Sequence, residues 1–176
     1  RPPRSTLFPY TTLFRSTVPG SRFTYAIGQL VLWSAKPGLV DGEGAVLKGG
    51  NFNKIAIANP KLAPYGAAAV ETMDKLGLAA ALTPKLVTGE SIGQTYNFIA
   101  TGNAELGFVA LAQVLDGGKL KSGSMWVVPA KYHAPIIQDA VILKRAAANP
   151  AAKAWMALMR SPNTQDFIRS YGYEVK

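Results

Sequence analysis

Apolar residues recur along this chain in two spacings. Short, nearly continuous apolar runs predict buried strands, and they occur at Arg22–Ser34, Lys54–Ala58, Leu82–Val87, Leu106–Leu111, Met125–Val128 and Ile136–Leu143. Segments with apolar residues every three or four positions predict helices, and they cover Pro64–Leu76, Ser91–Thr101, Pro150–Arg160 and Pro162–Tyr171. Strands that alternate with helices indicate α/β layers.

Three of the predicted helices have one apolar face that can pack on a sheet. These faces consist of Ala67, Val70 and Met73; of Ile92, Tyr96 and Ile99; and of Ala151, Trp155, Leu158 and Met159. Gly77 is expected to end the first helix, and Ser161 to cap the last. A short helical turn is expected at Glu43–Leu47.

Composition narrows the class of protein. The chain has 176 residues, 48% of them apolar, so it can bury a core. It has no cysteine, which excludes disulfides, thiol catalysis and thiolate zinc sites. No apolar run reaches the roughly 18 residues that span a bilayer. The formal charge is +9, but the basic residues are scattered and do not alternate with aromatic ones, so nucleic acid is not an expected partner.

Residues 1–16, RPPRSTLFPYTTLFRS, differ from the rest of the chain. They lack the apolar core and the cleavage site of a signal peptide. The stretch Thr6–Ser16 is similar to the translation of a sequencing-library adapter, so we exclude it from fold reasoning. Without the three arginines of residues 1–16, which are Arg1, Arg4 and Arg15, the formal charge falls to +6. The remaining chain is then expected to be the C-terminal part of a longer protein.

No catalytic or nucleotide-binding motif is recognisable. His133 is the only histidine, and no Ser/His/Asp set or carboxylate pair accompanies it, so it is interpreted as a surface or structural residue. Gly49-Gly50 and Gly117-Gly118 do not fit the glycine patterns of phosphate-binding loops. The sequence therefore predicts neither an enzyme nor a cofactor.

The stretch Ala58–Glu71, ANPKLAPYGAAAVE, carries the strongest binding signal. It runs from a strand end through a turn into a helix with Pro64 in its first turn. The first turn of a helix has unpaired N–H groups and the positive end of the peptide dipoles, which together favour an anion.

Three stretches resemble the periplasmic molybdate-binding proteins, the solute receptors of molybdate ABC importers. They are Ala58–Leu78, Thr88–Leu111 (TGESIGQTYNFIATGNAELGFVAL) and Ser161–Lys176. With the crossing strands, the resemblance covers nearly all of residues 22–176. It implies an α/β fold of the type II periplasmic-binding-protein class, in which two lobes enclose a tetrahedral oxyanion with neutral hydrogen-bond donors.

The resemblance also implies the binding residues. Tyr65, with Pro64 and Gly66 beside it, matches the family's ligand-binding tyrosine, and Ile92 matches a backbone N–H donor. Tyr65 and Ile92 would reach the molybdenum only through the molybdate oxygens. Another branch of the family has a tyrosine where this chain has Ala110, which favours Tyr65 as the source of the phenol.

On this basis residues 36–135 are expected to form a complete second lobe. Residues 17–35 and 136–176 would be the remnant of the first lobe, with exposed apolar surface. The expected function is binding of molybdate or tungstate for delivery to an ABC permease, by a periplasmic monomer that contributes half of the site. The alternatives are a receptor for another oxyanion, such as sulfate or phosphate, and the effector-sensing domain of a transcription regulator.

Overall fold

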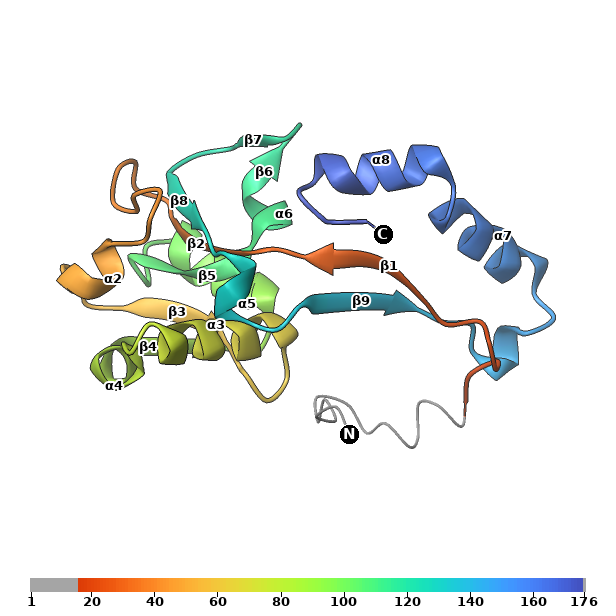
Figure 1. Cartoon of the computed structure of the whole chain (residues 1–176), viewed down its shortest axis with the longest axis horizontal. Coiled ribbons are helices and arrows are strands. Elements are labelled where there is room, and N and C mark those ends of the chain that lie inside the picture. Colours follow the sequence, from red (N-terminus) through yellow and green to blue (C-terminus); the bar gives the residue numbers. More distant parts are fainter. Residues whose placement is uncertain (1–15, 176) are drawn as a thin grey trace.

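The largest sheet of the described residues has five strands in the order β4-β3-β5-β2-β8, and with its covering helices it forms one end of the molecule, called the central lobe below (Figure 1). This computed structural model describes residues 16–175, so the segment interpreted as an adapter lies, apart from Ser16, outside the described residues. The strands are β2 (Leu30–Ser34), β3 (Ile55–Ala58), β4 (Leu86–Gly89), β5 (Leu106–Ala110) and β8 (Ser124–Val127). β3 runs parallel to β4 and β5, whereas β2 runs antiparallel to β5 and β8.

Helices cover both faces of this sheet, because its strands are apolar on both sides. α3 (Pro64–Lys75) lies on one face with the short helices α2 (Val46–Gly49) and α4 (Ala79–Leu82). α5 (Ile92–Ala100) and α6 (Leu111–Val114) lie on the other. Alternate residues of one strand serve the two layers: Leu30 and Leu32 pack toward α3, and Val31 and Trp33 toward α5. The α/β prediction is confirmed.

The buried face of α3 agrees only partly with the predicted one, since Met73 is buried as expected and Val70 packs against the core cluster. Ala67 and Val70 are only partly buried. The buried residues are Tyr65, Gly66, Ala68, Ala69, Thr72 and Met73. Small side chains on this face let the helix approach the strands closely, so the contact is set by size and not by hydrophobicity alone.

α3 ends as predicted. Gly77 has φ +70°, and its N–H and that of Leu78 donate to the carbonyls of Asp74 and Met73 in a Schellman motif.

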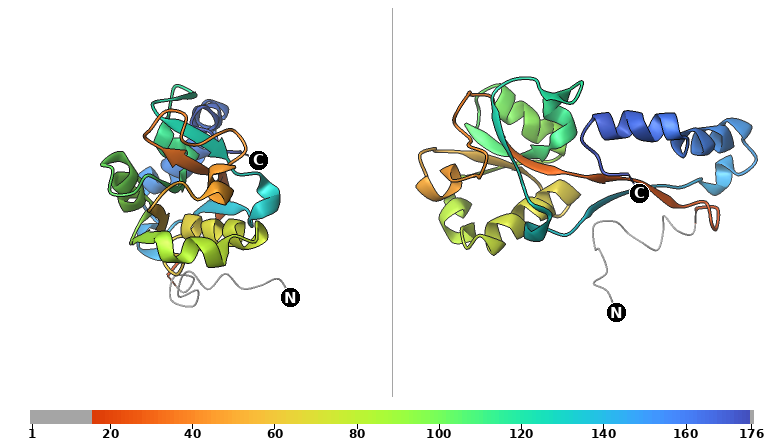
Figure 2. Two further views of the ribbon diagram at one scale, coloured as in Figure 1. Left: turned by 90° about the vertical axis from the view of Figure 1, so that its left-hand side faces the viewer. Right: turned by 45° about the horizontal axis from the view of Figure 1, so that its top comes forward.

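A two-stranded ribbon leaves the sheet and carries the C-terminal helices. β1 (Phe23–Gly28) pairs antiparallel with β9 (Ile136–Ala140), with a bulge between Thr24 and Ala26. α7 (Pro150–Met159) and α8 (Pro162–Ser170) follow β9, and the chain then returns to bridge Ile27 with Glu174. In Figures 1 and 2 this ribbon and its helices extend away from the sheet and its own helices.

Two predicted strands differ from the observed ones. The run Arg22–Ser34 forms two strands, because the chain leaves the ribbon at Gln29 and enters the large sheet as β2. β2 therefore pairs with strands from residues 36–135 in the large sheet, and the division into lobes expected at residue 35 stays a prediction. The strand expected at Leu82–Val87 starts at Leu86, since Thr83–Lys85 forms a 3₁₀ turn.

The other expected strands and helices are present with ends shifted by a few residues, including the helical turn, which is α2.

The helices beyond the ribbon are poorly covered. Trp155 and Leu158, expected on the packed face of α7, are 60% and 51% exposed, and only Met156 of that helix is buried. α8 has no buried residue, and its Phe167 is 63% exposed. The predicted exposure of apolar surface is thus confirmed for the described part of residues 136–176, whereas the apolar run Leu30–Trp33 of the other expected remnant, residues 17–35, is buried.

The end of α8 meets the central lobe at a hairpin. The hairpin strands β6 (Leu115–Asp116) and β7 (Lys119–Leu120) are joined by a turn whose two glycines have positive φ. Gly172, at φ +80°, lies against Leu111 and Leu115, and a Cβ at this glycine would stand 2.5 Å from Leu111 Cδ2. A residue without a side chain is therefore required where the C-terminal segment approaches the lobe.

Candidate functional site

The helix starts of the central lobe gather at one edge of the sheet. Because β3, β4 and β5 are parallel, their carboxyl ends, Ala58, Gly89 and Ala110, reach the same edge, where α3, α5 and α6 begin. The Asn59 N–H donates to the Gly89 carbonyl at 2.7 Å and ties two of these ends together. Open α/β sheets bind ligands outside the carboxyl ends of their strands. This edge is the candidate site.

The first turn of α3 presents one backbone donor. Among the described residues no side chain caps this helix, whose N-cap is Ala63. Pro64 has no N–H and fixes the turn, as predicted. The N–H groups of Gly66 and Ala67 donate to the Ala63 carbonyl, which leaves the Tyr65 N–H without a partner in this part of the chain.

Gly66 has a steric role at this turn. A Cβ at this position would lie 2.1 Å from the Ala58 carbonyl oxygen, so only glycine lets the helix start rest on the end of β3. Pro64 and Gly66 therefore shape the turn, and Tyr65 supplies its unpaired N–H.

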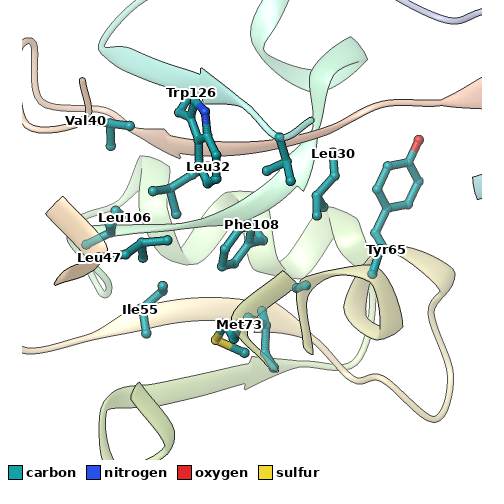
Figure 3. Packing of buried hydrophobic residues seen from close by; sticks show 14 of the residues in the cluster. Leu30, Leu32, Val40, Leu47, Ile55, Tyr65, Met73, Leu106, Phe108 and Trp126 are labelled. Atoms are coloured by element: carbon teal, nitrogen blue, oxygen red, sulfur yellow. The ribbon is translucent and has the colours of Figure 1, made fainter. Parts of the chain in front are cut away.

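The Tyr65 side chain is buried at the junction of the lobe and the ribbon. Only 8% of the residue is exposed, and its ring belongs to the core cluster that covers the α3 face of the sheet. Figure 3 shows the ring at the edge of this cluster with its hydroxyl pointing away from Phe108 and Met73. The hydroxyl lies against Gly28 of β1, where a Cβ would stand 2.1 Å away.

Three polar side chains surround the Tyr65 hydroxyl. Gln138 Nε2 donates to it at 3.2 Å, and Gln138 Oε1 accepts from the Tyr25 hydroxyl at 2.8 Å. Burial, together with the neighbouring Tyr173 hydroxyl, raises the pKa of Tyr65 well above that of a free phenol. Tyr65 is therefore a neutral hydrogen-bond donor at any physiological pH.

The start of α5 presents two further backbone donors. The helix starts at Ser91 as predicted, with Ser91 as its N-cap, whose Oγ accepts from the Gln94 N–H at 3.2 Å. Gln94 Oε1 accepts from the Glu90 N–H at 2.7 Å. These bonds leave the N–H groups of Ile92 and Gly93 without partners among the described residues. The Ile92 side chain packs against both apolar clusters and fixes the helix start.

The first backbone donors at the start of the short helix α6 are used within the protein. Gln113 Oε1 accepts from the Ala110 N–H at 3.1 Å, and its Nε2 donates to the Ile92 carbonyl at 3.2 Å. The Leu111 N–H donates to the Gln29 carbonyl. Gln113 thus joins α6 to α5 and holds the first turn of α5 in place. The sequence shows Gln113 and Gln138 only as polar residues within apolar runs, which does not indicate their contacts.

Metal and membrane sites find no support in the described residues. Within residues 16–175 no three His, Asp or Glu side chains converge in a way that could hold a metal ion. None of the helices in this range is both long and apolar enough to cross a bilayer. His133 is 8% exposed with its Nδ1 2.8 Å from the Ala134 carbonyl, so it is a structural residue and not a surface one.

Comparison with known proteins places this fold in a family. A sequence profile described as bacterial extracellular solute-binding protein matches residues 12–174. The chain belongs to this family.

Two curated relatives of this solute-binding protein are named molybdate-binding protein ModA. The protein from Azotobacter vinelandii is 59% identical over 160 residues, which are 91% of this chain and 64% of that protein. The one from Rhodobacter capsulatus is 57% identical over 156 residues, 89% of this chain and 60% of that protein. The chain thus spans less than two thirds of the length of either relative.

A comparison with solved structures also finds a molybdate-binding protein. The periplasmic molybdate-binding protein of Azotobacter vinelandii superposes with a TM-score of 0.90 at 46% identity, over 96% of this chain and 74% of that chain. The fold and the resemblance to molybdate-binding proteins are therefore confirmed. These comparisons do not test the individual site residues, so Tyr65, Ile92, Pro64 and Gly66 stay predictions.

Proposed function

We propose that this chain binds a tetrahedral oxyanion, molybdate or tungstate, at the carboxyl edge of its five-stranded sheet. One observation carries the proposal: two helix starts, those of α3 and α5, direct unpaired N–H groups to the edge where the neutral Tyr65 hydroxyl lies. The high identity to proteins named for molybdate binding supports this choice of anion.

Neutral donors suit a dianion in a cleft. Several directed N–H and O–H groups satisfy its oxygens, and the helix dipoles add a partial positive charge. A buried lysine or arginine would add a desolvation cost that such donors avoid. Tyr65 and Ile92 would contact the molybdate oxygens and not the metal atom. We therefore propose binding without catalysis and without a further cofactor.

The described residues supply these donors from one side of the edge. Beyond the ribbon, α7 and α8 begin with Asn149 and Ser161, whose side chains already accept from their own helices. We therefore expect weak binding by this chain alone. As part of a receptor, it would act as a periplasmic monomer and deliver the anion to the permease of an ABC importer, with lobe closure around the anion.

The test is a titration of the ¹⁵N-labelled chain with sodium molybdate, followed by backbone amide shifts. The proposal predicts saturable shifts at Tyr65, Ile92 and Gly93, with millimolar affinity. Matched titrations with tungstate and sulfate separate anion selectivity from ionic strength, and tungstate should act like molybdate. Absence of saturable shifts at these three amides, or equal shifts with sulfate, would contradict the proposal.

A further inference from the structure

Gln138 is the polar residue through which the ribbon meets the helix start of α3. It lies on β9 and is the neighbour of Asp139, which faces a different set of partners, Arg22 and Thr24. Its amide spans two phenols, accepting from Tyr25 and donating to Tyr65. Tyr173 is a second hydrogen-bonding side chain at the Tyr65 hydroxyl, and it raises the pKa of Tyr65, as a partner that accepts the phenol proton does, whereas Gln138 donates to the oxygen.

The direction of these bonds determines what the Tyr65 hydroxyl can do. A phenol oxygen that accepts one hydrogen bond retains its own proton for donation elsewhere. With Nε2 of Gln138 on the oxygen, the Tyr65 proton is directed away from β9, toward Tyr173 in the chain without ligand and toward an anion once one is bound in its place. If the amide were turned around, Oε1 would take that proton, and the hydroxyl would have no donor left for an anion.

We propose that Gln138 is a positioning residue, which holds the Tyr65 hydroxyl as a donor to the oxyanion, and that Tyr25 fixes the orientation of the Gln138 amide. This inference rests on the function proposed above. It also connects the two parts of the molecule, because a residue of the ribbon then determines the donor strength of a residue on the central lobe.

Burial makes this arrangement effective. Tyr65 is among the core residues, so its hydroxyl has little access to water as a replacement partner. The nearby Gly28 leaves room for the phenol but offers no side-chain group to orient it. Gln138, Tyr25 and Tyr173 also line an open groove of about 260 Å³ against Phe167 and Tyr171, so one side of the network borders an apolar surface.

A double-mutant cycle tests the proposal on the full chain. The probe is sodium molybdate, and the readout is the apparent affinity from the Ile92 amide shift. Gln138→Met keeps the length of the side chain and removes both hydrogen bonds. It should weaken binding about 5-fold in the wild-type background, the effect of one neutral hydrogen bond. In the Tyr65→Phe background the same substitution should change the affinity by less than about 2-fold.

Three controls separate positioning from structure. Asp139→Asn, on the same strand, should leave the affinity unchanged. Tyr25→Phe should weaken binding by less than Gln138→Met does, since it frees the amide without removing it. The free energy of unfolding is measured for each variant. If Gln138 had a purely structural role, Gln138→Met would lower this free energy, and the affinity losses of Gln138→Met and Tyr65→Phe would be additive in the double variant.

An observation without ligand tests the orientation directly. Tyr65→Phe should shift the Gln138 side-chain NH₂ resonances, because Nε2 faces the lost hydroxyl. Two results would overturn the positioning role even if the wild-type chain binds molybdate. One is unchanged NH₂ resonances, and the other is a Gln138→Met effect on affinity of the same size with Tyr65 and with Tyr65→Phe. An Ile92 amide that does not respond to molybdate in the wild-type chain would overturn the proposed function and this inference with it.

Discussion

The central lobe and the ribbon with its two helices differ in what covers their apolar residues. In the lobe, every residue of β2, β3 and β5 is buried, and helices close both faces of the sheet. Beyond the ribbon, α7 buries one residue and α8 none, and large side chains such as Trp155 and Phe167 are exposed. The lobe therefore contains its own core, whereas the second region depends on further contacts for its stability.

This difference explains where the candidate site lies. Donors that must hold an anion need a fixed backbone, and the starts of α3 and α5 are attached to the best-packed sheet of the molecule. The ribbon contributes only side chains that reach across, such as Gln138 and Tyr25. The predictions below test this division between a rigid lobe and a weakly covered second region.

The largest difference is expected between two phenylalanines. Phe108→Ala in β5 removes a fully buried ring and should lower the free energy of unfolding by about 3–5 kcal/mol. Phe167→Ala on α8 should cost about 0.5 kcal/mol, because its ring is mostly exposed already. Urea titrations of both variants provide the values. Equal losses would mean that α8 is as well packed as the sheet.

Two helix glycines give the next comparison. Gly66→Ala places a Cβ 2.1 Å from the Ala58 carbonyl oxygen, so α3 must shift, at a cost of about 2 kcal/mol. Gly93→Ala in α5 meets no atom closer than 3.8 Å and should change stability by less than about 0.5 kcal/mol. Thermal unfolding monitored by circular dichroism measures both. A Gly66→Ala variant with unchanged stability would show that the close contact of α3 with β3 is not required.

Tyr65 sharpens the comparison, because its phenol lies where the two regions meet. Its pKa is raised by burial, so above pH 10 the unfolded chain releases this proton while the folded chain keeps it. The stabilising contribution is complete below pH 10 and is lost as the pH rises further, by up to about 1.4 kcal/mol per pH unit. Tyr65→Phe should therefore show a shallower loss of stability between pH 10 and 11.5 than the wild type. Urea midpoints across pH 8–11.5 give this slope, and identical slopes would place the phenol in water.

The smallest effect is expected at the entry to β3. Partial burial of the Glu105 carboxylate raises its pKa, but hydrogen bonds from the N–H groups of Asn53 and Lys54 outweigh this and lower the pKa overall. This stabilisation is present above the ordinary pKa and is lost as the pH falls through the lowered value. Glu105→Gln should cost about 1 kcal/mol at pH 7 and less at pH 3, since water screens the site.

The matched variant is Glu90→Gln, because the Glu90 side chain makes no hydrogen bond within the described residues. This substitution should leave the free energy of unfolding unchanged at both pH 7 and pH 3. A loss for Glu105→Gln that stayed constant from pH 7 to pH 3 would contradict the lowered pKa.

Local signals predicted much of the fold. Pro64, Gly77 and Ser91 act within one turn of their own positions, so the starts of α3 and α5 and the end of α3 could be read from the sequence. The buried faces of the helices could not be read from the sequence, because they depend on residues that are distant along the chain. Small residues together with Met73 form the buried face of α3, and Trp155 and Leu158 of the apolar face predicted for α7 are exposed in the described chain.

Only part of the candidate site could be predicted from the sequence. Tyr65 and Ile92 came from the resemblance, and their N–H groups stand at the helix starts where anion binding is expected. Gln138 and Gln113 were missed because each acts on a residue that is 73 or 21 positions away in sequence. A glutamine inside an apolar run indicates a buried partner but does not name it.

The central claim is that the carboxyl edge of the five-stranded sheet holds the anion, and anomalous diffraction tests it most directly. Crystals of the chain grown with millimolar sodium molybdate, measured at the molybdenum absorption edge, should show one anomalous peak. We predict this peak within hydrogen-bonding reach, through its oxygens, of the N–H groups of Tyr65 and Ile92. A peak elsewhere on the molecule, with none at this edge, would contradict the account.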